Sequence, residues 1–129
     1  MKKIIIICVS VFLLVSLAAC NQTNENNKKK LDEKVFTQGQ TLAQYYYAGI
    51  RGNVKKTDKI DTFQQHFQDA YLSDQYDSEE EGVFILTIAS LKTNYETYQK
   101  EEKKQQDTKK EMQKKLNELQ KEFGITYKK

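Results

Sequence analysis

The stretch SEEEGVFILTIASL, residues 78–91, decides the fold that we expect for this chain. It opens with Ser78 and, three residues later, Glu81, the spacing of a capping box, and acidic side chains in a first turn stabilise the helix dipole. The apolar side chains that follow would lie on nearly every side of a helix, as in the central element of a small bundle. A buried strand is the rival interpretation of VFILTI, but the chain has no second strand-like run to pair with it.

Downstream of this stretch the apolar positions narrow to one seam, which continues in the same heptad register beyond the polar residues 100–111. Its members are Phe84, Ile88, Leu91, Tyr95, Tyr98, Met112, Leu116, Leu119 and Phe123. This agreement favours one partly coiled-coil-like helix over residues 79–123, about 67 Å long at ~1.5 Å per residue. The alternative is a break near Asp107 and a fourth helix that folds back, because Thr108 and Glu111 form a second capping box. Gly124 is typical of a helix end with a left-handed cap.

Two shorter helices are predicted upstream, each from apolar residues that recur at steps of three and four. The first stripe is Leu31, Val35, Gly39, Leu42, Tyr46 and Ile50, and the second is Ile60, Phe63, Phe67, Ala70 and Tyr71. Gly52-Asn53 ends the first helix and Thr57 or Asp58 begins the second, while Gly39 allows another helix to approach closely. The sequence therefore predicts an all-α domain over residues 31–129, a small bundle of three helices with a long C-terminal helix.

The beginning of the chain has a different composition. Met1-Lys2-Lys3 precedes the apolar run IIIICVSVFLLVSLAA, residues 4–19, which is the layout of a secretory signal peptide. These residues would reach about 24 Å as a helix, short of the ~30 Å hydrocarbon core, so a permanent transmembrane anchor is the weaker alternative. The run ends in Leu17-Ala18-Ala19-Cys20, which resembles the lipobox of bacterial lipoproteins.

That resemblance implies that Cys20 receives a diacylglycerol, that residues 1–19 are removed as a lipoprotein signal peptide, and that lipid anchors the protein to the extracytoplasmic face of the cell membrane. Two or more acyl chains give stable anchoring. Residues 21–30, NQTNENNKKK, are polar and lack apolar periodicity, so residues 20–30 are expected to form a lipidated, disordered tether. An ordinary secretory signal with a leftover thiol is the alternative.

The groups that a catalyst would need are scarce in the predicted mature chain. Cys20 is consumed by lipid and Cys8 lies in the signal peptide, which leaves no thiol for a disulfide, a metal or a nucleophile. His66 is the one histidine, and packing beside Phe63 is the expected role, although Asp69 on the next turn could orient it. The sequence has no H-E-x-x-H, no phosphate-cradling glycine loop and no EF-hand spacing. We therefore expect no enzyme, no cofactor and no metal.

Two groups of side chains are candidate partner contacts. Tyr46 would face the core, while Tyr45 and Tyr47 would project to either side, where they could stack on sugar rings or a partner protein. Residues 99–129 hold ten Lys and six acids, net +4, and form a basic arm that a solvated helix face also explains. The candidate cations are Lys109, Lys110, Lys114 and Lys115. Nucleic acid is not expected as a partner, because no aromatic-and-basic recognition motif is present.

These observations lead us to expect a lipid-anchored, non-catalytic interaction or blocking module whose partner is a membrane or envelope protein. In size, short tether and lack of catalytic groups the chain resembles the small surface lipoproteins by which conjugative elements and prophages exclude a second copy of the element. That resemblance lies in the overall organisation of the chain and covers no diagnostic motif beyond the lipobox. The alternative is a spacer lipoprotein whose basic rod binds the envelope or cell wall. The heptad seam could also pair between two copies of the chain.

Overall fold

The computed structural model describes residues 31–52 and 54–129, and all regular structure within them is helical. The helices are α2 (Glu33–Gly49), α3 (Asp58–Leu72), α4 (Glu79–Lys100) and α5 (Gln105–Phe123), with a short 3-10 turn, η1 (Glu102–Lys104), before the last. The all-α prediction is confirmed, but these residues form four α-helices rather than three. The predicted signal peptide, Cys20 and the tether lie outside the described residues.

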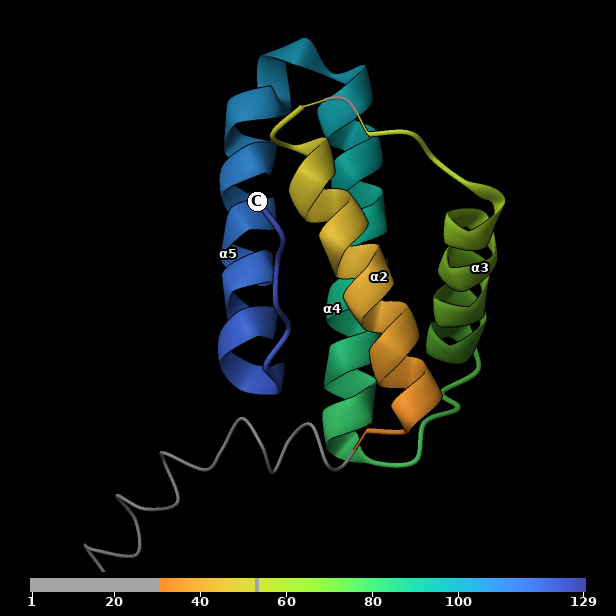
Figure 1. Ribbon diagram of the computed structural model, residues 1–129. Coiled ribbons are helices and arrows are strands. Elements are labelled where there is room, and N and C mark those ends of the chain that lie inside the picture. Colours follow the sequence, from red (N-terminus) through yellow and green to blue (C-terminus); the bar gives the residue numbers. More distant parts are fainter. Residues whose placement is uncertain (1–30, 53) are drawn as a thin grey trace, which may run out of the picture.

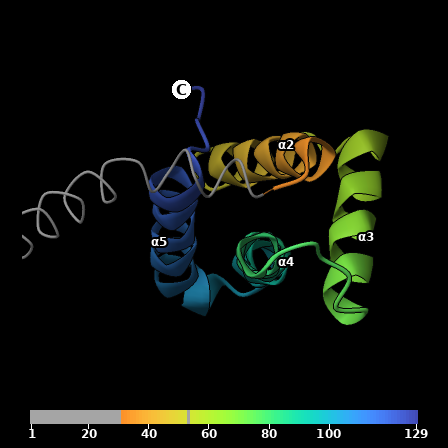
Figure 2. The ribbon, with the colours of Figure 1, turned by 90° about the horizontal axis from the view of Figure 1, so that it is seen from below.

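Helix α4 is the centre of the bundle, as its sequence predicted. Figure 2 shows it end-on, with α5, α2 and α3 around three of its sides. The ring of Phe84 is fully buried and lies next to an aromatic ring from each neighbouring helix: Phe36 of α2, Phe67 of α3 and Phe123 of α5. The fourth side of α4 is open, and there Val83 and Leu86 are 51% and 47% exposed.

The start of α4 is fixed by the predicted cap and by a buried carboxylate. Ser78 is the N-cap, and its hydroxyl accepts a hydrogen bond from the Glu81 N–H at 3.1 Å. The Glu81 carboxylate accepts from the backbone N–H groups of Asp77, at 3.2 Å, and of Asp32, at 3.0 Å. Because Asp32 is the N-cap of α2, Glu81 ties the beginnings of α2 and α4 together.

The prediction of one helix over residues 79–123 is wrong. Helix α4 ends at Lys100, Glu101 has φ −117° and ψ 90°, and α5 runs back along α4, as Figure 1 shows. In a straight rod Phe123 would lie about 58 Å from Phe84, whereas their ring centroids are 5.0 Å apart. The seam residues of α5 are buried in the chain's own core: Met112, Leu116, Leu119 and Phe123. Each such burial contributes about 1.5–3 kcal/mol, which outweighs one helix interruption.

The alternative prediction, a fourth helix that folds back, is confirmed, but its position was wrong. The interruption lies at Glu101, before the predicted Asp107. Thr108 is a buried residue inside α5 rather than its cap, and Lys104 at the N-cap makes no side-chain capping bond.

Helices α2 and α3 follow the sequence closely. Thr57 is the N-cap of α3, and its hydroxyl accepts from the Ile60 N–H at 3.3 Å. Gly39 allows the predicted close approach, because a Cβ placed there would overlap the ring of Phe84 and lie 2.9 Å from the Ile88 side chain. Tyr46 is fully buried, as predicted.

The C-terminal residues double back along α2. Gly124 has φ +70° and ends α5, as predicted, and Ile125 returns to the core. Figure 1 shows the chain then running beside α2 and α5. The side-chain amide of Gln40 both donates to the C=O and accepts from the N–H of Thr126, and Gln44 does the same with Lys128. Two glutamines therefore hold an extended segment of backbone.

Candidate functional site

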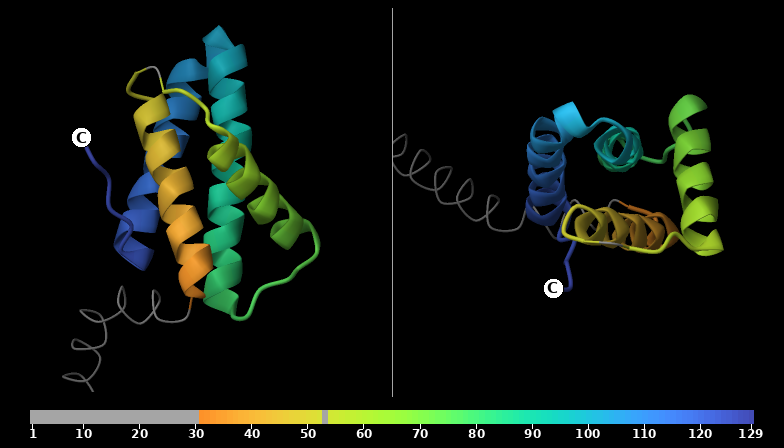
Figure 3. Two further views of the ribbon diagram at one scale, coloured as in Figure 1. Left: turned by 45° about the vertical axis from the view of Figure 1, so that its right-hand side comes forward. Right: turned by 90° about the horizontal axis from the view of Figure 1, so that it is seen from above.

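A groove of about 430 Å³ lies between α3 and α4. Its α3 wall is formed by residues that recur at steps of three and four, and so share one face of that helix: Gln64, Phe67, Gln68, Tyr71 and Leu72. Figure 3 shows that α3 is inclined to α4, so that the two helices diverge toward the C-terminal end of α3, and the loop after Leu72 crosses back to α4.

The inner end of the groove is polar and includes a buried amide. The Gln64 side chain is 7% exposed, and its Nε2 donates to the hydroxyl of Tyr46 at 2.8 Å. Its Oε1 and the Nδ2 of Asn94 on α4 are both buried, and neither has a hydrogen-bond partner among the described residues. An unpaired buried polar atom costs about 1–3 kcal/mol. The fold tolerates this cost at both atoms.

The outer end of the groove is apolar. Leu72 is 70% exposed, and Tyr71 and Leu86 beside it in the lining are also exposed large side chains. Val83 lies one turn before Leu86 on the open side of α4, which extends the apolar surface along that helix. Contiguous exposed apolar surface of this kind is uncommon on monomeric soluble proteins and marks interaction sites.

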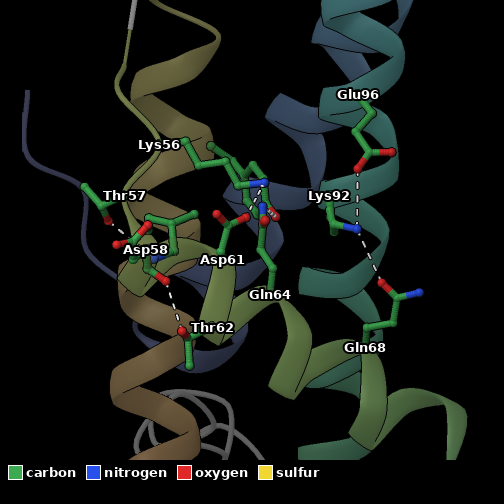
Figure 4. A network of polar contacts seen from close by, with 11 residues as sticks. Lys56, Thr57, Asp58, Asp61, Thr62, Gln64, Gln68, Lys92 and Glu96 are labelled. Carbon is green, nitrogen blue, oxygen red and sulfur yellow. Dashed lines mark hydrogen bonds and ion pairs between the residues drawn. The ribbon is translucent and has the colours of Figure 1, made fainter.

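Between the two ends, polar side chains span the groove. Figure 4 shows Gln68 of α3 and Lys92 and Glu96 of α4 joined in a row. The Lys92 ammonium donates to Gln68 Oε1 at 3.3 Å and lies 3.4 Å from a carboxylate oxygen of Glu96. The charges of Lys92 and Glu96 cancel, so the groove is close to neutral. Burial raises the pKa of the adjacent Tyr46 well above the ordinary tyrosine value, which keeps its hydroxyl protonated.

Neither predicted tyrosine offers an open ring face. Tyr45 is 8% exposed and packs edge-on against Tyr46 and Tyr95, so its ring is covered by the chain's own side chains. The Tyr47 ring stacks on Tyr127 at 4.6 Å between centroids, and the guanidinium of Arg51 lies 3.6 Å from its centroid. Two groups at these distances occupy opposite faces of one ring. The chain itself therefore uses the stacking surfaces that the sequence assigned to a sugar or partner.

The predicted cations lie on α5, away from the groove. Lys109, Lys110 and Lys114 are exposed, and Lys115 is half-buried with its ammonium 3.5 Å from Glu111. They lie on a separate helix from the groove and do not form part of it.

The remaining candidates have ordinary structural surroundings. His66 is exposed, and its Nδ1 lies 3.2 Å from Gln38 Oε1 rather than beside Asp69, whose carboxylate accepts from Gln65. No group of three or more His, Cys, Asp or Glu residues suited to a metal ion occurs in residues 31–52 and 54–129. In the same part of the chain, every helix is too short or too polar to cross a bilayer.

The sequence analysis missed the residues of the groove. Gln64 lies four residues after Ile60 and three before Phe67, so a polar side chain on the predicted apolar stripe was the available signal. Asn94 lies immediately before the seam residue Tyr95, about 100° from it around α4. What the pattern lacks is the placement of α3 against α4, which forms the groove.

No protein-family model, no curated protein and no solved structure matches this chain.

Proposed function

We propose that this protein is a lipid-anchored, non-catalytic interaction module of the extracytoplasmic membrane face, which binds and blocks a membrane or envelope protein through the groove between α3 and α4. Exclusion of a conjugative element or phage is the role that we favour. The lipobox Leu17-Ala18-Ala19-Cys20 supports the anchor and its location.

The observation that carries the proposal is the exposed apolar mouth of the groove. The sequence of α4 is apolar on nearly every side, which suits a helix covered all round. Three sides are covered by the chain itself, and Val83 and Leu86 are left exposed on the fourth, next to Leu72. Covering these side chains with a partner would remove apolar surface from water at about 25 cal/mol per Å².

The spacer alternative has less support. It required a basic rod reaching away from the membrane, and α5 instead folds back along α4. The exposed lysines of α5 remain a surface that an anionic wall polymer could meet. However, acidic residues alternate with them along the helix, among them Glu111, Glu118 and Glu122. Binding to purified wall material that is lost at high salt, and in a variant with Lys109, Lys110, Lys114 and Lys115 neutralised, would favour the spacer.

The test is genetic and uses the full chain expressed in a recipient cell. Wild type is expected to lower the uptake of a cognate conjugative element or phage, assayed across a panel of elements. Cys20→Ala is expected to release the protein from membranes and abolish the effect. The double variant Leu72→Asp/Leu86→Asp is expected to abolish it while the protein stays at the membrane.

The matched control is Gln106→Asp, which adds an acid at an exposed position of α5 away from the groove. It is expected to behave as wild type. Unchanged uptake of every element tested by the wild-type chain would reject the exclusion role. Full activity of the double variant would reject the groove as the contact surface.

A further inference from the structure

The basic and acidic side chains of α5 lie on different sides of the helix. At about 100° per residue, an arc of about 140° holds four of its lysines, and the other α5 side chains in that arc are neutral amides. The lysines of this arc are Lys109, Lys110, Lys114 and Lys121. The neighbouring arc of the exposed side holds the acidic residues, which are Asp107, Glu111, Glu118 and Glu122. Charges that alternate in sign along the sequence are therefore separated around the folded helix.

Two other parts of the chain extend the lysine arc into a wider surface. The guanidinium of Arg51, just after α2, donates to the Oε1 atom of Gln113 at 2.6 Å, and Gln113 belongs to the same arc of α5. Lys128 is held on α2 by Gln44 and lines one shallow hollow together with Arg51. We call these six cations the basic surface: Arg51, Lys109, Lys110, Lys114, Lys121 and Lys128.

The charge of the basic surface is largely uncompensated. In the part of the chain that the structure describes, Lys115 is the α5 lysine with an ion pair, 3.5 Å from Glu111, and both lie outside the surface. Glu118 borders the surface beside Lys114 and Lys121, but its single charge is outnumbered. Such a positive surface favours an anionic partner.

The separation of signs around α5 favours a flat partner. A membrane surface meets one side of a helix, so the acids of the neighbouring arc do not have to approach it, whereas a flexible polymer chain can follow the helix round to both sides. Lys110 and Lys121 are about 16 Å apart along the axis of α5, and Arg51 and Lys128 widen the surface toward α2. The cations therefore cover a face of the bundle instead of lining a narrow cleft.

The predicted anchor would hold this face near a membrane. The backbone N–H of Asp32 donates to Glu81 in the first turn of α4, and the same end of α4 contacts Phe123 at the end of α5. The predicted tether therefore joins the bundle at the end of α5 that carries Lys121. Residues 21–30 can span at most about 33–36 Å, so the membrane lies within reach of the whole surface.

We propose that the basic surface rests on anionic phospholipid headgroups of the membrane that holds the lipid anchor. Figure 2 shows α5 and α3 on opposite sides of α4, so this contact would turn the groove between α3 and α4 away from the membrane, toward a partner. The inference rests on the proposed function and adds the orientation in which the module is held.

The experiment measures which side of the anchored, full-length chain lies against the lipid. A fluorophore is attached through Asn117→Cys, between Lys114 and Lys121 on α5, or through Gln65→Cys on the exposed side of α3. The vesicles contain equal parts of phosphatidylglycerol and phosphatidylcholine, or phosphatidylcholine alone, with a headgroup spin label as quencher. In the anionic vesicles the α5 label is expected to be quenched several-fold more than the α3 label. The difference is expected to vanish in phosphatidylcholine and at high salt, which screens the attraction.

The double variant Lys114→Glu/Lys121→Glu is expected to remove the difference in quenching. Each cation near an anionic surface favours the contact by about fivefold, so two reversed charges weaken it by at least about 25-fold. The matched control is Lys59→Glu/Lys115→Glu, which changes the net charge equally but at α3 and on the acidic side of α5. It is expected to keep the difference.

Three results would overturn the inference: equal quenching of the two labels in anionic vesicles, a difference that persists in phosphatidylcholine, or a difference that survives the double reversal. Loss of the difference on adding poly(glycerol phosphate) at equal phosphate concentration would assign the surface to a wall polymer and also overturn it. Any of these results from an anchored chain leaves the proposed function standing. A mass spectrum without lipid on Cys20 would reject the anchor instead, and the same labels would then report contact with added anionic vesicles.

Discussion

The bundle has a closed side, formed by α2, α5 and the C-terminal residues, and an open side, formed by α3 and the exposed face of α4. Side chains of the same kinds have different surroundings on the two sides. On the closed side, α5 packs against α4 and the C-terminal residues run along α2, where Gln40 and Gln44 pair with backbone. On the open side, α3 diverges from α4, Leu72 is in water, and the Oε1 atom of Gln64 has no described partner.

The difference shows on which surface the side chains already have partners within the same chain. Amide and apolar groups on the closed side are satisfied by residues 105–129 of the same chain. On the open side, Leu72 and Leu86 remain exposed, and the proposed partner would cover them. Stability should therefore depend on the closed side and binding on the open side.

The largest contrast is expected between two identical substitutions. Leu116 of α5 is fully buried, so Leu116→Ala should lower the free energy of unfolding by about 2–5 kcal/mol through lost burial and the cavity left behind. Leu72→Ala should change it by no more than about 0.5 kcal/mol, because that side chain is exposed. Urea unfolding followed by circular dichroism measures both, and equal losses would show that Leu72 is part of the stable core.

Two glycines extend the contrast to the backbone. Gly39→Ala should cost about 1–3 kcal/mol, because the new Cβ meets the Phe84 ring and the packed α2–α4 contact cannot open without strain. Gly52→Ala is the matched control, since a Cβ there meets nothing within 4 Å, and it should be neutral or stabilising by about 0.4–1 kcal/mol. A neutral Gly39→Ala, by the same unfolding assay, would contradict the close approach.

The parts of this fold that sequence could predict are those fixed by neighbours along the chain. Thr57 and Ser78 cap the helices that they were predicted to begin, and Gly124 ends α5, because each acts on backbone groups a few residues away. The position of the turn at Glu101 was predicted wrongly, because it depends on a contact between residues far apart along the chain. Residues 100–106 are mostly good helix formers, and the chain turns there because Phe123 must reach Phe84.

The candidate site could not be predicted from the sequence for a similar reason, because it depends on contacts between residues far apart along the chain. Tyr127 stacks on Tyr47 because the C-terminal residues fold back over α2, whereas Arg51 lies only four residues after Tyr47 along the chain. The groove depends on the angle between α3 and α4. Periodicity gives the face on which a side chain lies but not the distance between two faces.

The hydroxyl of Tyr46 lies where the core meets the groove, and it should make stability depend on alkaline pH. Burial raises its pKa in the folded protein above the ordinary value of 10.0, so the unfolded chain loses the proton first. Stability from this group is therefore complete below about pH 10 and falls as the pH rises further. Tyr127, whose pKa burial also raises, contributes in the same direction from the closed side.

Tyr46→Phe should separate this effect from packing. At neutral pH it should cost about 1–3 kcal/mol, because the Gln64 amide then loses its remaining partner. Above pH 10 the variant should lose stability less steeply than wild type. Urea midpoints between pH 7 and 11 measure both, and parallel profiles would mean that Tyr46 ionises as readily in the fold as in the unfolded chain.

The smallest effects compare one change of type, amide to leucine, at a paired and at an unpaired amide. Gln44→Leu removes two hydrogen bonds to Lys128 and should cost about 0.5–1.5 kcal/mol, at the modest end because these groups are near water. Asn94→Leu removes an unpaired buried donor and puts a better helix former in α4, so it should be neutral or stabilising. Thermal unfolding of both variants gives the signs. A destabilised Asn94→Leu would mean that the Nδ2 atom of Asn94 has a partner within the fold.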